Sequence, residues 1–250
     1  TSPMAFTGNK FEFRALGSSQ SISGPNIALN TIMAEELEQF ADELEGSKDF
    51  QADLAALIRR VLTEHQRIIF NGNGYTEDWI AEAEKRGLCN FPSTAEALPA
   101  YIAQKNVDLF VKHGIYTPDE VQARYEIHAE NYAAVTSIEA KTMADMIRRQ
   151  ILPAVSAFGA ELCERMGKKQ QMNLSCGYET ETAKAVSALT EELYAACGQL
   201  EADIAGIPAD ATEAMGYCHK NLVPGMAKAR KAADELEALL TKEAWHFTVY

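Results

Sequence analysis

The chain has 250 residues, of which 47% are hydrophobic and 24% are charged, so it can form one large domain or two small ones with a core of ordinary size. Its formal net charge of −13 argues against nucleic-acid binding, because most of that affinity comes from cations that neutralise phosphates. No run of about 18 apolar residues occurs, so no membrane span is predicted.

The five cysteines are scattered and form no Cys-x-x-Cys pair, which predicts free thiols in a reducing cytoplasm. Since Thr1-Ser2-Pro3 is not a natural translation start, we expect a cut or processed sequence.

A strictly alternating pentapeptide, residues 10–14, lies near the start of the sequence. In an extended strand successive side chains point to opposite faces, so Phe11 and Phe13 face one way. Lys10, Glu12 and Arg14 face the other way. The aromatic face can pack on a core. The charged face has a carboxylate between two cations, which suits a metal ion and an anionic phosphate or carboxylate.

The residues alone leave a second interpretation of this strand open. A surface strand with alternating charge has the same pattern, because cross-strand ion pairs are common. Residues 17–26 are small, polar and contain Gly and Pro, which predicts a loop. That loop either connects the strand to a helix or brings its backbone amides close to a ligand.

Almost everything after residue 26 is predicted to be helical, because apolar residues recur with a period near 3.6 residues. In the first helix this stripe consists of Ile27, Ile32, Leu37, Phe40 and Leu44. The predicted helices cover residues 27–45, 49–69, 76–86, 93–113, 117–150 with an extension to 166, 178–205 and 211–247. Short connections make the last two antiparallel neighbours, as in a helical hairpin or bundle. The predicted fold is therefore mainly α, with one or two N-terminal strands followed by long antiparallel helices.

Two of these helices start with capping boxes, in which a hydroxyl residue and a glutamate three residues later satisfy each other's end of the first turn. The pairs are Ser93 with Glu96 and Thr117 with Glu120. Pro99 lies early in the first of these two helices, so a kink or a slightly later start is expected there.

The helical region contains breaks and charges that need a structural or a functional reason. Pro153 is expected to bend its helix, and Pro224-Gly225 is expected to interrupt the last one. The Arg148-Arg149 and Lys168-Lys169 doublets are interpreted as solvated helix ends. The five histidines stand in no His-x-x-x-His or Glu-x-x-His pair, so no metal site is predicted on the helices.

The segment Asn9–Arg14, followed by Leu16–Asn26, closely resembles the late catalytic segment of glutamine synthetases, most of all the large bacterial class called type III. The resemblance continues through Ile68–Tyr75 with Trp79, and it covers nearly all of the chain. Glu243–Phe247 resembles the start of the family's C-terminal tail.

The resemblance implies a chemistry. In this family ATP phosphorylates the side-chain carboxylate of glutamate, and ammonia then displaces the phosphate, with Mg²⁺ or Mn²⁺ as the metal cofactor. It implies that Glu12 is a metal ligand and that Lys10 approaches the ATP phosphates. It also implies that Arg14 is catalytic and binds the transferring phosphate or the glutamate carboxylate, for which a bidentate fork is suited.

The resemblance also implies a domain organisation. Residues 1–26, with a strand at 9–15 and a loop, would be the end of a catalytic α+β domain, and residues 27–250 a helical C-terminal region. The family's other metal ligands lie upstream of the motif, so the chain alone is expected to be inactive. The implied partners are the remaining part of the catalytic domain and further copies, in a cytoplasmic homo-oligomer of stacked rings. The alternative is a stand-alone helical interaction or assembly module without catalysis.

Overall fold

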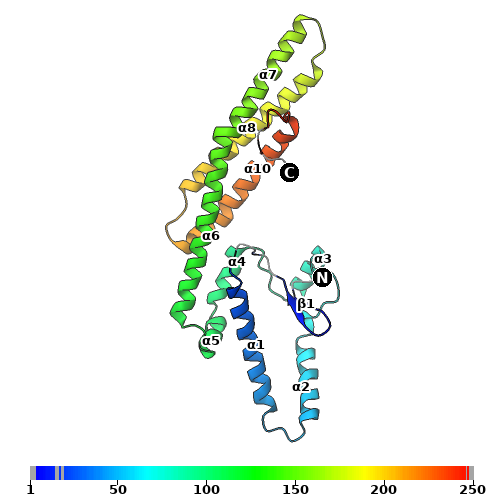
Figure 1. The fold of residues 1–250 in the computed structure, drawn as a ribbon, viewed down its shortest axis with the longest axis vertical. Coiled ribbons are helices and arrows are strands. Elements are labelled where there is room, and N and C mark those ends of the chain that lie inside the picture. Colours follow the sequence, from blue (N-terminus) through cyan, green and yellow to red (C-terminus); the bar gives the residue numbers. More distant parts are fainter. Residues whose placement is uncertain (1–3, 15–16, 18–19, 246, 248–250) are drawn as a thin grey trace. The chain divides into compact units, whose positions relative to one another are not determined.

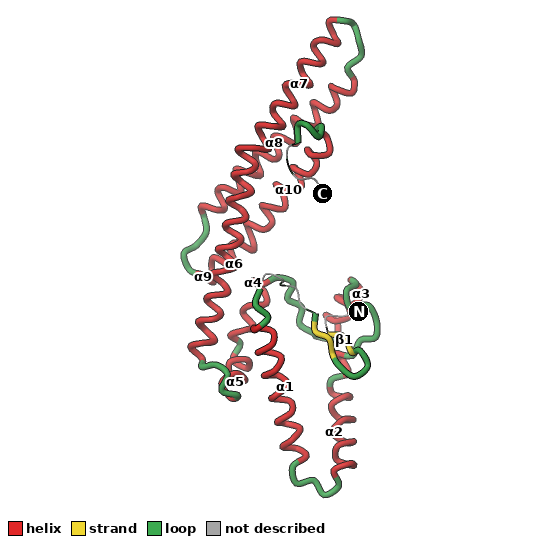
Figure 2. The backbone as a smooth tube through the Cα atoms, in the orientation of Figure 1, coloured by secondary structure: helices red, strands yellow, loops and turns green. Residues whose placement is uncertain are grey.

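The computed structural model describes residues 4–14, 17, 20–245 and 247, and the chain forms two compact units (Figure 1). The N-terminal unit spans Thr1–Gln122 and the C-terminal unit spans Ala123–Tyr250. The predictions that involve Thr1-Ser2-Pro3, Leu16, Ser18-Ser19 and His246 lie outside the described residues. The fold is mainly helical with a single described pair of strands, as the sequence predicts (Figure 2).

The N-terminal unit begins with an antiparallel hairpin of strands β1 (Met4–Phe6) and β2 (Phe11–Phe13). Its register pairs Phe6 with Phe11, so both rings and that of Phe13 lie on one face. These three rings are exposed by 64%, 66% and 47%, respectively. The aromatic face that could pack on a core is therefore left open within the described chain.

Helices of the N-terminal unit follow the predicted order. They are α1 (Ser23–Leu44), α2 (Phe50–Glu64), the 3-10 turn η1 (Gln66–Ile68), α3 (Glu77–Lys85), α4 (Thr94–Ala97), the 3-10 turn η2 (Leu98–Ile102) and α5 (Gln104–Lys112). The capping box before α4 is confirmed, since Ser93 Oγ accepts from the Glu96 amide at 3.2 Å. The single helix predicted over 93–113 is wrong. Pro99, which lacks an N–H, lies in the 3-10 turn that separates α4 from α5.

Few hydrophobic side chains of the N-terminal unit are buried. Among the described residues these are Leu57, Phe110 and Val121. The apolar stripe predicted on α1 does not form a core here, because Ile32 and Leu37 are 48% and 58% exposed. The helical period of the stripe is right, but the described chain covers it only in part: Ile27, Phe40 and Leu44 are partly buried.

The C-terminal unit is built from long helices. They are α6 (Pro118–Met146), the π-helical turn η3 (Ile147–Ile151), α7 (Leu152–Gln171), α8 (Gly177–Ala205), α9 (Ala211–Tyr217), the π-helical turn η4 (Cys218–Leu222) and α10 (Val223–Leu239). Helix α8 contacts both α7 and α10, and the core between them includes the fully buried Leu162, Leu193, Leu200, Leu222 and Leu236. The capping box of Thr117 at the start of α6 is confirmed by a 3.3 Å bond from the Glu120 amide to Thr117 Oγ1.

Both predicted proline breaks are resolved in the same way. Pro153 and Pro224 each stand at the second residue of a helix that directly continues a five-residue π-helical turn. A proline cannot donate the usual i→i−4 bond, and a π-bulge re-registers the preceding hydrogen bonds. The expected interruption at Pro224-Gly225 is thus a change of helix type just before the proline.

The Arg148 side chain corrects one sequence interpretation. It was expected at a solvated helix end, yet it lies inside η3 and makes two bonds to Glu201 of α8, Nε to Oε1 at 3.0 Å and Nη2 to Oε2 at 2.6 Å. Its guanidinium also lies 4.6 Å from the centroid of the Tyr194 ring. A forked, stacked arginine of this kind fixes α8 against the turn before α7.

None of the described helices combines the length and the apolar character needed to cross a membrane.

Leu200 tests how far the C-terminal unit depends on the packing of α8. We expect Leu200→Ala to lower the free energy of unfolding of this unit by about 2–5 kcal/mol, because it leaves a cavity in a fully buried site. Ile127→Ala on α6 is the control, since the Ile127 side chain is 61% exposed and its loss should change stability by less than about 0.5 kcal/mol. Urea unfolding measures both values, and equal effects of the two substitutions would contradict the assignment of the core.

Candidate functional site

The charged face of β2 brings the three predicted site residues together. Lys10 Nζ lies 3.6 Å from Glu12 Oε1, and Arg14 Nη2 donates to Glu12 Oε2 at 2.9 Å. The Arg14 hydrogen bond is the main cause that lowers the pKa of the Glu12 carboxyl, with a smaller contribution from Lys10. Glu12 is thus held ionised between two cations, as the alternation of the strand predicts.

This arrangement offers one hard oxygen ligand group and two cations for an anion. A carboxylate suits Mg²⁺ or Mn²⁺, but one carboxylate gives at most two of the roughly six oxygens such ions require. Among the described residues no other His, Cys or carboxylate side chains form a metal-type group with Glu12. The described residues around Glu12 therefore do not form a complete donor set for such an ion.

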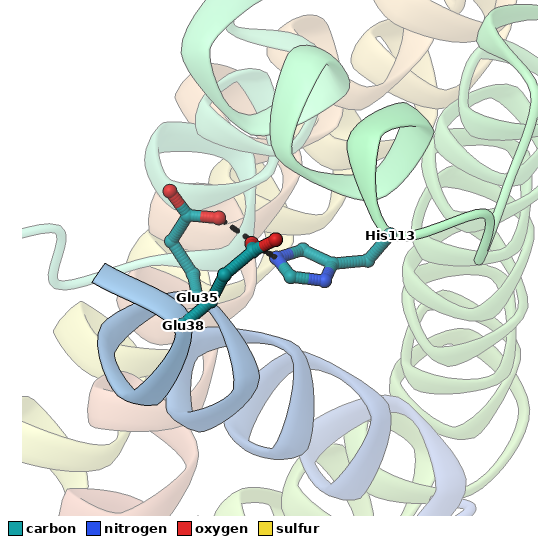
Figure 3. Close-up of side chains that lie close together, drawn as sticks. All are labelled: Glu35, Glu38 and His113. Atoms are coloured by element: carbon teal, nitrogen blue, oxygen red, sulfur yellow. Dashed lines mark hydrogen bonds and ion pairs between the residues drawn. The ribbon is translucent and has the colours of Figure 1, made fainter. Parts of the chain in front are cut away.

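A second cluster joins α1 to the end of α5 (Figure 3). Ligand atoms of Glu35, Glu38 and His113 all lie within 4.8 Å of one another. His113 Nε2 lies 2.8 Å from Glu35 Oε2, and Lys112 Nζ donates to Glu35 Oε2 at 2.7 Å and lies 2.9 Å from Glu38 Oε2. Sequence reasoning missed this cluster, because its glutamates and its two basic residues are far apart in the sequence.

The second cluster has the features of an ion-pair clasp. Lys112 already supplies a cation in contact with both carboxylates, at the distances of ordinary charged hydrogen bonds. Lys112 is the largest cause that lowers the pKa of Glu35 to about 2, followed by Gln39 and His113. Glu35 in turn is the largest cause that raises the pKa of Lys112. The cluster ties α1 to α5 in a unit that has few buried hydrophobic side chains.

The clasp predicts a pH dependence of the stability of the N-terminal unit. Because the folded pKa of Glu35 is depressed from 4.5 to about 2, its contribution is present above pH 4.5 and is lost as the pH falls toward 2. Glu35→Gln should lower stability near neutral pH and remove this part of the acid sensitivity. The measurement is urea unfolding at a series of pH values, followed by Trp79 fluorescence in a Trp245→Phe background.

Glu36→Gln is the matched control, because Glu36 is the exposed neighbour on the same helix. It should leave both the stability and the acid sensitivity of the unit unchanged. An identical pH profile for Glu35→Gln and the parent chain would show that the clasp does not contribute.

Comparison with known proteins shows which family the sequence is similar to. Residues 53–170 match the sequence family described as the glutamine synthetase C-terminal domain. The chain is 35% identical over 266 residues to the type-3 glutamine synthetase of Dictyostelium discoideum and 32% identical over 256 residues to the glutamine synthetase of Butyrivibrio fibrisolvens. The glutamine synthetase of Bacteroides fragilis is 28% identical over 267 residues.

Each of these alignments covers the whole of this chain but only 36% of the relative. The chain thus spans about a third of the length of the curated relatives it matches. Its strand with the alternating charged face and its long helices both fall within the aligned region. The chain therefore belongs to the glutamine synthetase family, in which it corresponds to a C-terminal portion of the type III enzymes.

Proposed function

We propose that the full-length protein is a glutamine synthetase, which uses ATP to form glutamine from glutamate and ammonia. We propose further that this chain supplies part of the residues that line its active site. The observation that carries the proposal is the ionised Glu12 between Lys10 and Arg14, on a strand of a chain that belongs to this family. Phosphoryl transfer depends on positioned cations that neutralise charge, and this face provides two of them beside one metal-type ligand.

Each of the three side chains has a role that its chemistry suits. Glu12 is proposed to be one ligand of a Mg²⁺ or Mn²⁺ ion, which would hold the ATP phosphates when bound. Lys10, a point charge on a flexible stem, is proposed to approach those phosphates. Arg14, a planar fork, is proposed to bind the transferring phosphate or the glutamate carboxylate.

The uncovered surface of the N-terminal unit supports a role within a larger assembly. The aromatic face of the hairpin is exposed, as are Ile32 and Leu37 of α1. Large exposed apolar patches usually mark interaction sites. We propose that the remaining part of the catalytic domain packs on this surface, in a cytoplasmic homo-oligomer. No observation on the described residues favours a stand-alone module instead.

Substitutions at the charged face of the full-length protein test this function. We expect Glu12→Gln and Arg14→Lys each to lower kcat/KM for ATP- and ammonium-dependent glutamine formation by about 100-fold or more, because each removes charge or fork geometry at the phosphoryl group. Glu45→Gln, an exposed carboxylate at the end of α1, is the control and should keep full activity. Parent-like rates in both variants would exclude the proposed site.

The 250-residue chain by itself should not make glutamine. Glu12 offers too few oxygens to hold the metal ions, so the purified chain should show no ATP- and ammonium-dependent synthesis above background. The full-length protein, assayed in parallel, serves as the positive control. Measurable synthesis by the isolated chain would mean that the chain assembles a complete site.

A further inference from the structure

Three side chains that can bind a metal ion meet between α1 and the end of α5 (Figure 3). The Nε2 atom of His113 lies 2.8 Å from Glu35 Oε2 and 3.9 Å from Glu38 Oε2. In a tetrahedral zinc site with bonds of about 2.1 Å, neighbouring ligand atoms are about 3.4 Å apart, and the two distances lie on either side of this spacing. Rotation of the flexible glutamate side chains adjusts both distances without movement of the backbone.

The backbone fixes the positions from which these ligands extend. Glu35 and Glu38 stand three residues apart in α1, which places them on the same face of the helix. His113 directly follows α5, where its backbone N–H still donates to the Leu109 carbonyl oxygen at 3.3 Å. The side chains of His113 and Glu35 are only 16% and 19% exposed. Two of the three ligands have therefore already lost much of the conformational freedom that a bound ion would otherwise have to remove.

Lys112 shows where a cation binds in this cluster. Its Nζ lies 2.7 Å from Glu35 Oε2 and 2.9 Å from Glu38 Oε2, so one ammonium group contacts both carboxylates. The lysine side chain is 47% exposed, and its long stem allows the ammonium group to turn into solvent. Because an ion pair at such a position contributes modestly to stability, a divalent ion with three ligands can take the place of Lys112.

We propose that Glu35, Glu38 and His113 form a binding site for a zinc ion, which displaces Lys112 from the two carboxylates. Zinc accepts imidazole nitrogen and carboxylate oxygen together, and three protein ligands leave the fourth tetrahedral position to water. Mg²⁺ prefers six oxygen ligands in an octahedral arrangement, so the imidazole selects against it. When zinc binds, the ammonium group of Lys112 moves into solvent.

The zinc ion stabilises a unit that has few buried hydrophobic side chains among its described residues. Glu35 and His113 are 78 residues apart in the sequence, so the three ligands come together only when α1 and α5 are in place. Free energy of metal binding to such a site therefore adds to the free energy of folding. The site uses none of Lys10, Glu12 and Arg14, and the inference does not depend on the proposed function.

Calorimetric titration of Zn²⁺ into the 250-residue chain, in a buffer with a large excess of Mg²⁺, tests the site. Cys89, Cys163 and Cys176 are first replaced by serine, because thiols that are not buried also bind zinc. We expect about one zinc ion per chain in this background. Glu38→Gln and His113→Ala should each weaken binding by about tenfold or more, because each removes a ligand.

His65→Ala is the matched control for the histidine substitution, since His65 is exposed and lies outside the cluster. It should leave the affinity for zinc unchanged.

Lys112→Met gives the more decisive result, because its expected effect has the opposite sign. The substitution removes the competing ammonium group, so zinc should bind about three- to tenfold more tightly. Lys105→Met, which alters an exposed lysine of the same helix, is the matched control and should leave the affinity unchanged. Partial unfolding weakens binding and cannot imitate this gain, so Lys112→Met decides the question even if His113→Ala does not fold.

Urea unfolding of the N-terminal unit, followed by Trp79 fluorescence in the Trp245→Phe background, provides an independent measurement. Saturating zinc should raise the unfolding midpoint of the parent chain and leave that of Glu38→Gln unchanged, because zinc binds only the folded unit. The proposal would be overturned by a chain that binds no zinc in the Mg²⁺ buffer, by an affinity that survives both ligand substitutions, or by a Lys112→Met variant that binds zinc no more tightly than the parent.

Discussion

The burial of α8 between α7 and α10 is the interaction on which the C-terminal unit depends. Side chains such as Leu193 and Leu200 are fully buried there, and this apolar area supplies the main favourable free energy of folding. The π-helical turns and the Arg148 ion pair of this unit are compatible with the packing of these helices. The π-helical turns let the chain pass its two prolines without leaving the bundle, and Arg148 closes a forked ion pair onto α8.

The N-terminal unit is organised by different forces. It buries few hydrophobic side chains, and directed polar contacts fix its elements locally. The clasp of Lys112 and His113 on Glu35 joins α5 to α1, and Arg86 fixes the loop before α3. Each contact of this kind contributes modestly to stability, and together they fix the geometry of the unit. A unit of this kind is suited to being completed by packing against another surface.

That difference between the units bears on the proposed chemistry. The charged face of β2 would require further ligands to hold a metal ion. The aromatic side chains on the other face of the same strand are exposed and would be buried by a neighbouring apolar surface. Both requirements are met at once if one neighbouring structure supplies the ligands and the apolar contact. An active site closed in this way excludes water, which strengthens the charge interactions on which phosphoryl transfer depends.

Local patterns in the sequence are sufficient to predict the helical class, the two capping boxes and the alternation that places Lys10, Glu12 and Arg14 on one face. These are local properties, set by periods of two and about 3.6 residues and by hydrogen bonds within one turn. Tertiary packing, in contrast, leaves Ile32 and Leu37 of α1 exposed and brings Glu35 to His113 and Arg148 to Glu201. Those contacts join residues distant in the sequence, and no local pattern encodes which distant segment comes to lie beside another.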